Sequence, residues 1–195
     1  MSTPVNPNIL NGFKAVGTLT GASANLQEVK CATAAGDSVA IFPGDAVKLT
    51  GGTDANGFLI VAQANAGDVP LAGVMAGVVP DGTDLTAQYR KASTATYIFV
   101  NMDPTTIYEV QANAAVALAA AGKTCSLVQT AAGSTLMGTS GQQIDQSTLA
   151  TNTATFQFKA LGFSQTVGNI PNATYNRLYV KINNHAYAPS GVAGV

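Results

Sequence analysis

Short runs of β-branched and aromatic residues, separated by turns of Gly, Pro and Asn, recur along most of this chain. No segment carries a ten-residue helical period. The clearest turn signals are Pro43-Gly44-Asp45, Asn56-Gly57 and Pro80-Asp81-Gly82. Strands at this spacing predict an all-β fold, a β-sandwich or barrel of short antiparallel strands with at most one short helix. The expected strands cover residues 13–20, 26–31, 39–42, 47–50, 58–62, 71–79, 97–100, 107–111, 124–128, 156–163 and 178–182.

The densest strand signal lies in residues 89–111. A β-branched and aromatic run at 97–100 suits a pleated, half-buried surface, and alternation resumes at 107–111 after Asp103-Pro104. We interpret the two runs as a hairpin in the middle of the fold, onto which the poorer strands pair. The side chains expected to supply core contacts are Phe99, Tyr108, Phe156, Phe158 and Val180.

The length of 195 residues suits one domain, or two small ones at most. We expect a flexible N-terminal arm over residues 1–12, a single β-rich domain over 13–187 and a C-terminal tail over 188–195. The arm mixes turn formers with the apolar Val5, Ile9 and Leu10, so we expect it to be mobile in the isolated protein and ordered against a neighbour. Two further segments, 133–147 and 166–176, have the composition of loops, and the Ala-rich 114–121 suggests a short helix or an irregular excursion.

Charged residues make up only 10% of the chain, against roughly 25% in a typical soluble domain, and the net charge is −1. The chain therefore has no excess positive charge that would attract nucleic acid. We interpret Arg90-Lys91 as the solvated start of a strand rather than a phosphate site. No apolar stretch approaches the ~18 residues of a membrane span, and the N-terminus lacks the features of a secretory signal. We expect synthesis in a cytosol, with the product soluble or joined to an assembly. Such a weakly charged surface suits packing against neighbours, although a neutral extracellular-type β-protein has the same composition.

Four features could carry chemistry, and each has a simpler interpretation. Gly122-Lys123-Thr124 lacks the glycine that a phosphate loop needs five residues earlier, so we expect a tight turn. The one histidine, His185, follows a strand without a nucleophile motif, which favours a hydrogen-bonded turn residue.

The remaining two features concern metal ligands and thiols. Asn101, Asp103 and Glu109 could meet as oxygen ligands, but an Asx-turn on Asp103 is the simpler account. Cys31 and Cys125 form no paired metal or redox motif, and we expect two buried, reduced thiols. We therefore predict no catalytic, cofactor-binding or metal-binding residues, and a chain that is not an enzyme.

Several segments resemble a group of tailed-bacteriophage virion proteins of the head-decoration, or cement, type. They comprise the 97–111 region, the Ala-rich segment with Gly122-Lys123, the loop to Asp145-Gln146-Ser147, the 156–163 strand and the closing LYVKINNH of 178–185. The stretches GDSVAIFPGDAVKL and LAGVMAGVVP are similar to strands of phage capsid decoration proteins. The likeness covers residues 36–187 and consists of turn and core residues, so no individual site is carried over.

The resemblance implies a β-rich cement protein on the outside of an icosahedral head, at junctions between subunits of the major capsid protein. It implies a homo-oligomer, with a trimer favoured and a dimer possible, and no cofactor, nucleic acid or membrane partner. A virion-displayed fibre or carbohydrate-binding module is the alternative, with Tyr175, Tyr179 and Tyr187 as the candidate aromatics. A major capsid protein and an enzyme are the less favoured classes.

Overall fold

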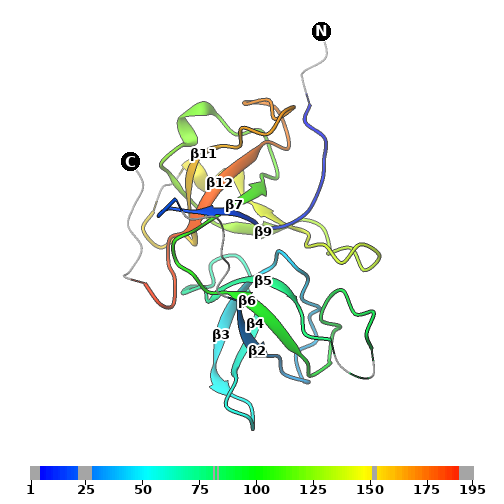
Figure 1. The fold of residues 1–195 in the computed structure, drawn as a ribbon. Coiled ribbons are helices and arrows are strands. Elements are labelled where there is room, and N and C mark those ends of the chain that lie inside the picture. The colour runs from blue at the N-terminus through cyan, green and yellow to red at the C-terminus, as the bar shows by residue number, and fades with distance from the viewer. Residues whose placement is uncertain (1–4, 22–27, 81, 83, 151–152, 189–195) are drawn as a thin grey trace.

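The structure, a computed structural model, describes residues 5–21, 28–80, 82, 84–150 and 153–188. Within these residues the chain forms a small closed barrel, drawn in the lower part of Figure 1, and a five-stranded sheet in the upper part. No α-helix occurs in the described part, where the helical segments are two 3₁₀ turns, η1 (Leu118–Ala120) and η2 (Gln146–Ala150). The predicted all-β fold is confirmed.

The barrel is built from five short strands in the order β2-β4-β3-β5-β6. Four of its pairings are antiparallel, and β2 and β4 close it through a parallel contact of Ala32 with Ile60. Alternate side chains point inward, among them Ile98, Val100 and Val61, and form a hydrophobic cluster of their own. The strands are β2 (Glu28–Ala32), β3 (Ala46–Thr53), β4 (Leu59–Gln63), β5 (Gly73–Val78) and β6 (Tyr97–Asn101).

The five-stranded sheet is antiparallel and has the order β1-β7-β12-β11-β8. The alternation in the sequence decides which face is buried, and β12 shows it most clearly, with Leu178, Val180 and Ile182 inward. Its strands are β1 (Lys14–Thr18), β7 (Thr106–Gln111), β8 (Thr124–Cys125), β11 (Phe158–Phe163) and β12 (Arg177–Ile182). A separate hairpin joins β9 (Leu127–Gln129) to β10 (Gln142–Ile144).

The buried face of the sheet packs on the outside of the barrel. The larger hydrophobic cluster joins Phe13, Tyr108 and Phe158 of the sheet side to Ala46 and Val74 of β3 and β5. Phe13 and Phe158 stack with their ring centroids 4.3 Å apart. This larger cluster therefore links the two β units, while the barrel interior keeps its separate cluster.

Buried amide side chains reinforce this junction. Gln142 accepts a hydrogen bond from Ala46 N (2.8 Å) and donates one to Ala64 O (3.0 Å). Gln157 donates to Asn65 O (2.8 Å) and Asp68 O (2.9 Å). Each glutamine belongs to the sheet side and satisfies backbone groups at the ends of barrel strands, where no ladder partner is available.

The predicted hairpin over residues 97–111 is wrong. Strand β6 pairs with β2 and β5 of the barrel, whereas β7 pairs with β1 and β12 of the sheet. The turn around Asp103 carries the chain from one unit to the other instead of folding it back. Both runs nevertheless have strands on each side, so each is a central strand of its own unit.

Two of the five predicted core side chains are not fully buried. Tyr108, Phe158 and Val180 are buried as expected, but Phe99 and Phe156 are only half-buried. On β6 the neighbours Ile98 and Val100 fill the barrel instead. Because side chains alternate across a strand, the expected register there was out by one residue.

The N-terminal arm, described from residue 5 onward, lies against the same chain. Asn6 is 4% exposed and donates to Ile170 O (3.1 Å) and Thr174 O (3.0 Å). Ile9 N donates to the side chain of Gln111 at 2.9 Å. These contacts give residues of the arm partners inside the chain, and ordering of the arm against a neighbouring subunit stays a prediction. Residues 1–4, and residues 189–195 of the predicted tail, lie outside the described residues.

Three smaller expectations differ from the structure. Residues 39–42 form no strand, because only Ile41 makes an isolated bridge, to Arg90. The expected strand at 124–128 divides at Ser126 into β8 and β9, which pair with β11 and β10 respectively. The loop expected over 133–147 includes β10 and the start of η2. The Ala-rich 114–121 is an irregular excursion with the single 3₁₀ turn η1.

Candidate interaction surfaces

The predicted tight turn at Gly122-Lys123-Thr124 is confirmed. Gly122 has φ +83°, Lys123 N donates to Ala120 O at 3.1 Å, and Thr124 opens β8. A phosphate loop instead wraps its ligand with successive backbone N–H groups and then opens a helix. This segment is a strand-entry turn.

His185 is a hydrogen-bonded turn residue, as predicted. It is 4% exposed, and its Nδ1 accepts a hydrogen bond from Tyr187 N at 3.0 Å. Burial lowers the pKa of His185, and the negative charge of Asp103 opposes that shift. The imidazole is therefore neutral near pH 7, with its proton on Nε2.

Asp103 forms the predicted Asx-turn. Its Oδ1 accepts hydrogen bonds from Thr105 N and Thr105 Oγ1, both at 2.7 Å. Glu109 points to other partners, Ser164 Oγ at 2.6 Å and Arg177 at 3.7 Å. The three oxygen-bearing residues therefore do not converge, and no group of three or more metal-ligating side chains occurs in the part of the chain that the structure describes.

Both cysteines are buried with free thiols, as predicted. Cys31 lies in the barrel cluster and Cys125 in the larger cluster. Burial raises the pKa of Cys31 to about 11 and also raises the pKa of Cys125. Neither thiol has the lowered pKa of a reactive cysteine.

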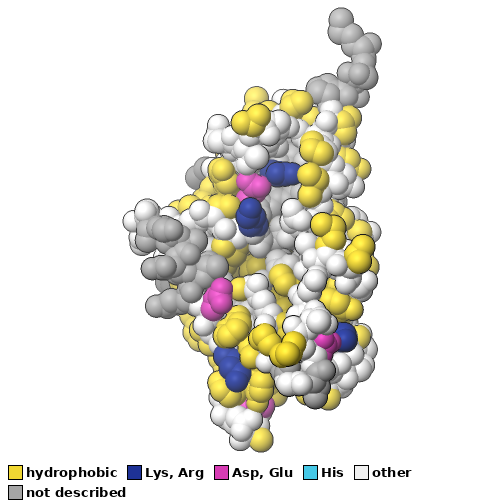
Figure 2. Space-filling model, turned by 45° about the vertical axis from the view of Figure 1, so that its right-hand side comes forward, with side chains coloured by type: hydrophobic (Ala, Val, Ile, Leu, Met, Phe, Trp, Pro, Cys, Tyr) yellow, Lys and Arg dark blue, Asp and Glu magenta, His cyan; other side chains and the backbone are white. Residues whose placement is uncertain are grey.

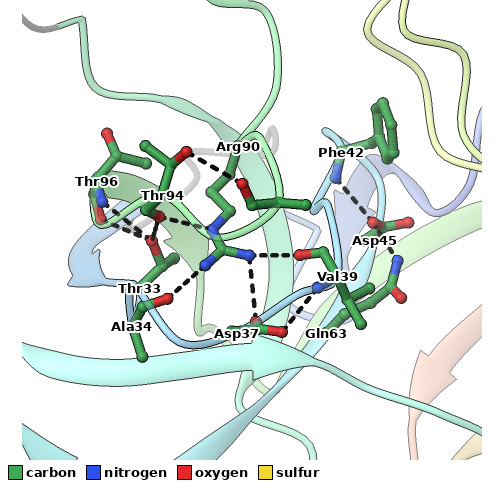
Figure 3. Close-up of polar contacts among 11 residues, drawn as sticks. Thr33, Ala34, Asp37, Val39, Phe42, Asp45, Gln63, Arg90, Thr94 and Thr96 are labelled. Carbon is green, nitrogen blue, oxygen red and sulfur yellow. Dashed lines mark hydrogen bonds and ion pairs between the residues drawn. The ribbon is translucent and has the colours of Figure 1, made fainter.

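The interpretation of Arg90 as a solvated residue is wrong. Arg90 is fully buried, and Figure 3 shows its guanidinium fanned over the loop that follows β2. It donates to the carbonyls of Ala34, Val39 and Thr94 and lies 3.4 Å from Asp37. Arg90 thus organises the end of the barrel, whereas Lys91 is exposed and pairs with Asp84 at 2.8 Å. The local sequence gave no signal for this role, because two of the three carbonyls, those of Val39 and Ala34, lie 51 and 56 residues away.

The three candidate tyrosines have different neighbours. The ring of Tyr187 lies 6.0 Å from that of His185, and the hydroxyl of Tyr179 lies 3.4 Å from Gln165 N. Tyr175 has φ +61° and lines a small pocket together with Asn6 and Arg177. No ring contact among these three tyrosines is found within the described residues.

A cleft of about 460 Å³ lies between β1 and the barrel. Exposed Lys14 and Glu28 line it together with buried Phe13, Val74 and Met75. Its volume falls in the range of small-ligand pockets. The sequence could not indicate this cleft, because its walls come from strands of both units.

The loop between β9 and β10, residues 130–141, projects from the body beside β9 (Figure 1). Its tip carries two adjacent apolar side chains, Leu136 and Met137, which are 87% and 70% exposed. The tip is held by hydrogen bonds from Ser134 N to Thr139 O and from Gly138 N to Ser134 O, both at 2.8 Å.

The base of the 130–141 loop is fixed against the body. Ser140 N donates to Pro43 O at 3.2 Å. Gly138 has φ +65°, and a Cβ there would lie 2.7 Å from Gln88 Cβ. The sequence predicted only a loop over 133–147, although Leu136-Met137 within a Gly-Ser-Thr run was a visible signal of exposed apolar residues.

Comparison with known protein families, curated proteins and solved structures found no match to this chain. In the described residues no helix is long and apolar enough to cross a membrane.

Proposed function

We propose that this chain is a decoration protein of a tailed-bacteriophage head, bound to the outside of the icosahedral capsid. It would bridge subunits of the major capsid protein, so that expansion of the head or pressure from the packaged DNA must also break these contacts. A protein that binds only the assembled lattice stabilises that lattice, and tighter binding stabilises it more. The proposal includes a homo-oligomer, with a trimer favoured, and no catalytic step, cofactor or nucleic acid.

The tip of the 130–141 loop is the observation that carries this proposal. A neighbouring pair of large apolar side chains that face solvent is unfavourable for an isolated protein and suits an interface. Because backbone hydrogen bonds already hold the turn that carries Leu136 and Met137, little backbone conformational entropy remains to be lost on binding. A rigid apolar projection of this kind fits a groove between subunits.

The rest of the surface supports the same interpretation. Figure 2 shows hydrophobic side chains spread over much of one face, with few charged groups among them. Other highly exposed apolar residues include Leu118 and Val167, at 61% and 101%. A host-attachment module would gain from a gathered aromatic platform, and the separate neighbours of Tyr175, Tyr179 and Tyr187 favour decoration over that alternative.

Binding to undecorated heads tests the role of the loop tip. Replacing Leu136→Ser together with Met137→Ser should lower the affinity for heads about tenfold or more, since exposed apolar anchors of an interface often contribute over 1 kcal/mol each. The melting temperature should stay unchanged, because both side chains face solvent. The fraction of protein that sediments with heads measures the effect.

Leu85→Ser is the matched control, since it removes an equally exposed leucine from a different loop. It should bind heads as the wild type does. If the double variant also bound like the wild type, the loop tip would not be the contact and the proposal would lose its main support.

A further inference from the structure

A short strap carries the chain from the end of the sheet to the barrel side. We define the strap as residues 184–188, which follow β12 and run toward the barrel in Figure 1, where they are drawn in red. Leu71 N donates to Asn184 O at 2.9 Å, and Ala186 N donates to Leu71 O at 2.8 Å. Between these two bonds, His185 forms an isolated parallel bridge with Leu71, which is fully buried just before β5. Two backbone hydrogen bonds to one residue therefore hold the strap against the barrel side.

The strap has a fixed base and a more lightly held outer part. The side chain of Asn184 donates to Ala154 O at 2.9 Å and to Phe156 O at 2.8 Å, and none of these groups titrates. Beyond His185 the strap lies near solvent, and Tyr187 is 53% exposed. Segments with few buried contacts open more easily than the strands of a core. Opening of the strap would therefore begin after Asn184, at His185.

The contacts of the buried His185 imidazole suit only its neutral state. Nδ1 accepts a hydrogen bond from Tyr187 N at 3.0 Å, and because a backbone N–H can only donate, Nδ1 carries no proton. Nε2 then carries the proton, and this atom has no hydrogen-bond partner among the described residues. A second proton would have to bind Nδ1, where it would face the N–H of Tyr187 and break that bond. Protonation would thus leave a buried charge whose N–H groups are both unpaired, which is costly.

The segments next to the strap offer little charge to stabilise an imidazolium. Burial lowers the pKa of His185, and the negative charge of Asp103, in the turn between β6 and β7, offsets only part of that shift. On the barrel side, Asp68 is already paired with a lysine at 2.8 Å. Residues 153–157, which anchor the base of the strap, are uncharged, and Lys181 on β12 is itself positive. The closed strap therefore disfavours protonation of the ring.

We propose that the strap is an acid-sensitive switch, in which protonation of His185 releases residues 185–188 from the barrel side while Asn184 stays anchored. Once the strap opens, water solvates the imidazolium and also replaces Ala186 N as the partner of Leu71 O. The closed state binds the second proton less tightly than the open state does. Closure is therefore favoured above the usual histidine pKa of about 6.5 and is lost progressively as pH falls below it. This inference goes beyond the proposed function, because the strap would open whether or not the chain binds a capsid.

Amide hydrogen exchange of the purified full chain tests the proposal. Rates are compared at about pH 7 and about pH 5, each corrected for the intrinsic exchange rate at that pH. The opening equilibrium reported by the amides of Ala186 and Tyr187 should rise about tenfold at the lower pH, because the open state takes up a proton that the closed state excludes. The amide of Val180, which lies between two paired strands, should keep its protection. This difference separates opening of the strap from unfolding of the sheet.

His185→Asn is the matched variant, because its Oδ1 can replace Nδ1 as the acceptor for Tyr187 N and cannot titrate. Its strap should open no more at about pH 5 than at about pH 7. An NMR titration of the wild-type imidazole gives a readout that needs no variant, and the ring should titrate below about pH 6.5. Three results would overturn the proposal: a ring that titrates at or above that pH, a wild-type strap whose protection is the same at both pH values, or equal acid opening in His185→Asn.

Discussion

Single buried polar residues fix much of this structure, and they act over long sequence distances. Arg90 joins carbonyls on two loops, and Asp45 accepts hydrogen bonds from Phe42 N (2.8 Å) and Gln63 Nε2 (2.7 Å), as Figure 3 shows. Hydrogen bonds offset the loss of water around such buried groups, although Asp45 Oδ1 has no hydrogen-bond partner among the described residues. Substitution of one such buried polar side chain should therefore change the free energy of unfolding more than substitution of an exposed one.

The orientation of β6 can be measured by truncating neighbouring side chains. Ile98→Ala should lower the free energy of unfolding by about 2–5 kcal/mol, because Ile98 is fully buried in the barrel. Phe99→Ala should have a smaller effect, since its side chain is half-buried. Denaturant unfolding of the two variants gives the comparison, and a larger loss for Phe99→Ala would mean that the opposite face of β6 is inward.

Asp45 should make the stability depend on pH. Burial raises the pKa of Asp45 to about 6, and hydrogen bonds from neighbouring groups, including Phe42 and Gln63, offset only part of that rise. The folded chain then holds this proton more tightly than the unfolded chain. Asp45 consequently contributes stability at low pH that is lost as pH rises from about 4 to about 6, on the order of 3 kcal/mol in all.

Unfolding of Asp45→Asn, compared with the wild type between about pH 4 and pH 7, isolates this effect. The comparison is needed because the lowered pKa of His185 acts in the opposite direction and removes stability as pH falls. Stability curves of the two proteins that run parallel over this range would show that Asp45 titrates normally.

At the scale of elements, the sequence predicted most strands and few of their partners. Alternation and turn residues place β3, β4, β5, β11 and β12 within a few residues of their observed bounds. The same signals cannot show that the chain crosses from barrel to sheet at Asp103. The residues of a hairpin turn and of a turn that connects two separate β units are the same. The sequence shows that Leu136 and Met137 are apolar residues within a loop. It cannot show that they are exposed, because the position of the loop depends on contacts with Pro43 and Gln88.

The junction between barrel and sheet should depend on Gln142. Gln142→Met keeps the size of the side chain but leaves Ala46 N and Ala64 O without partners, at about 1–3 kcal/mol for each orphaned group. Thermal unfolding should show a clear drop in melting temperature. Gln165→Met, at an exposed position, is the control and should unfold like the wild type. Equal melting temperatures for the two variants would mean that Gln142 does not join the units.

At the scale of the whole molecule, the two β units are joined by a hydrophobic cluster that spans both of them, and a second cluster fills the barrel. The apolar loop tip at Leu136 and Met137 and the exposed apolar residues Leu118 and Val167 lie in different segments of the chain. Exposed apolar side chains on separate parts of a stable body suit a component that contacts several neighbours at once. Capsid decoration requires contacts of this kind.

The most direct test of this account is the copy number and position of the chain in purified virions. Quantitative mass spectrometry against the major capsid protein should give a high copy number in a fixed ratio to the lattice. Electron microscopy of the same particles should show regularly spaced density on the outer head surface. A handful of copies at the tail, or absence from the particle, would contradict the proposed function.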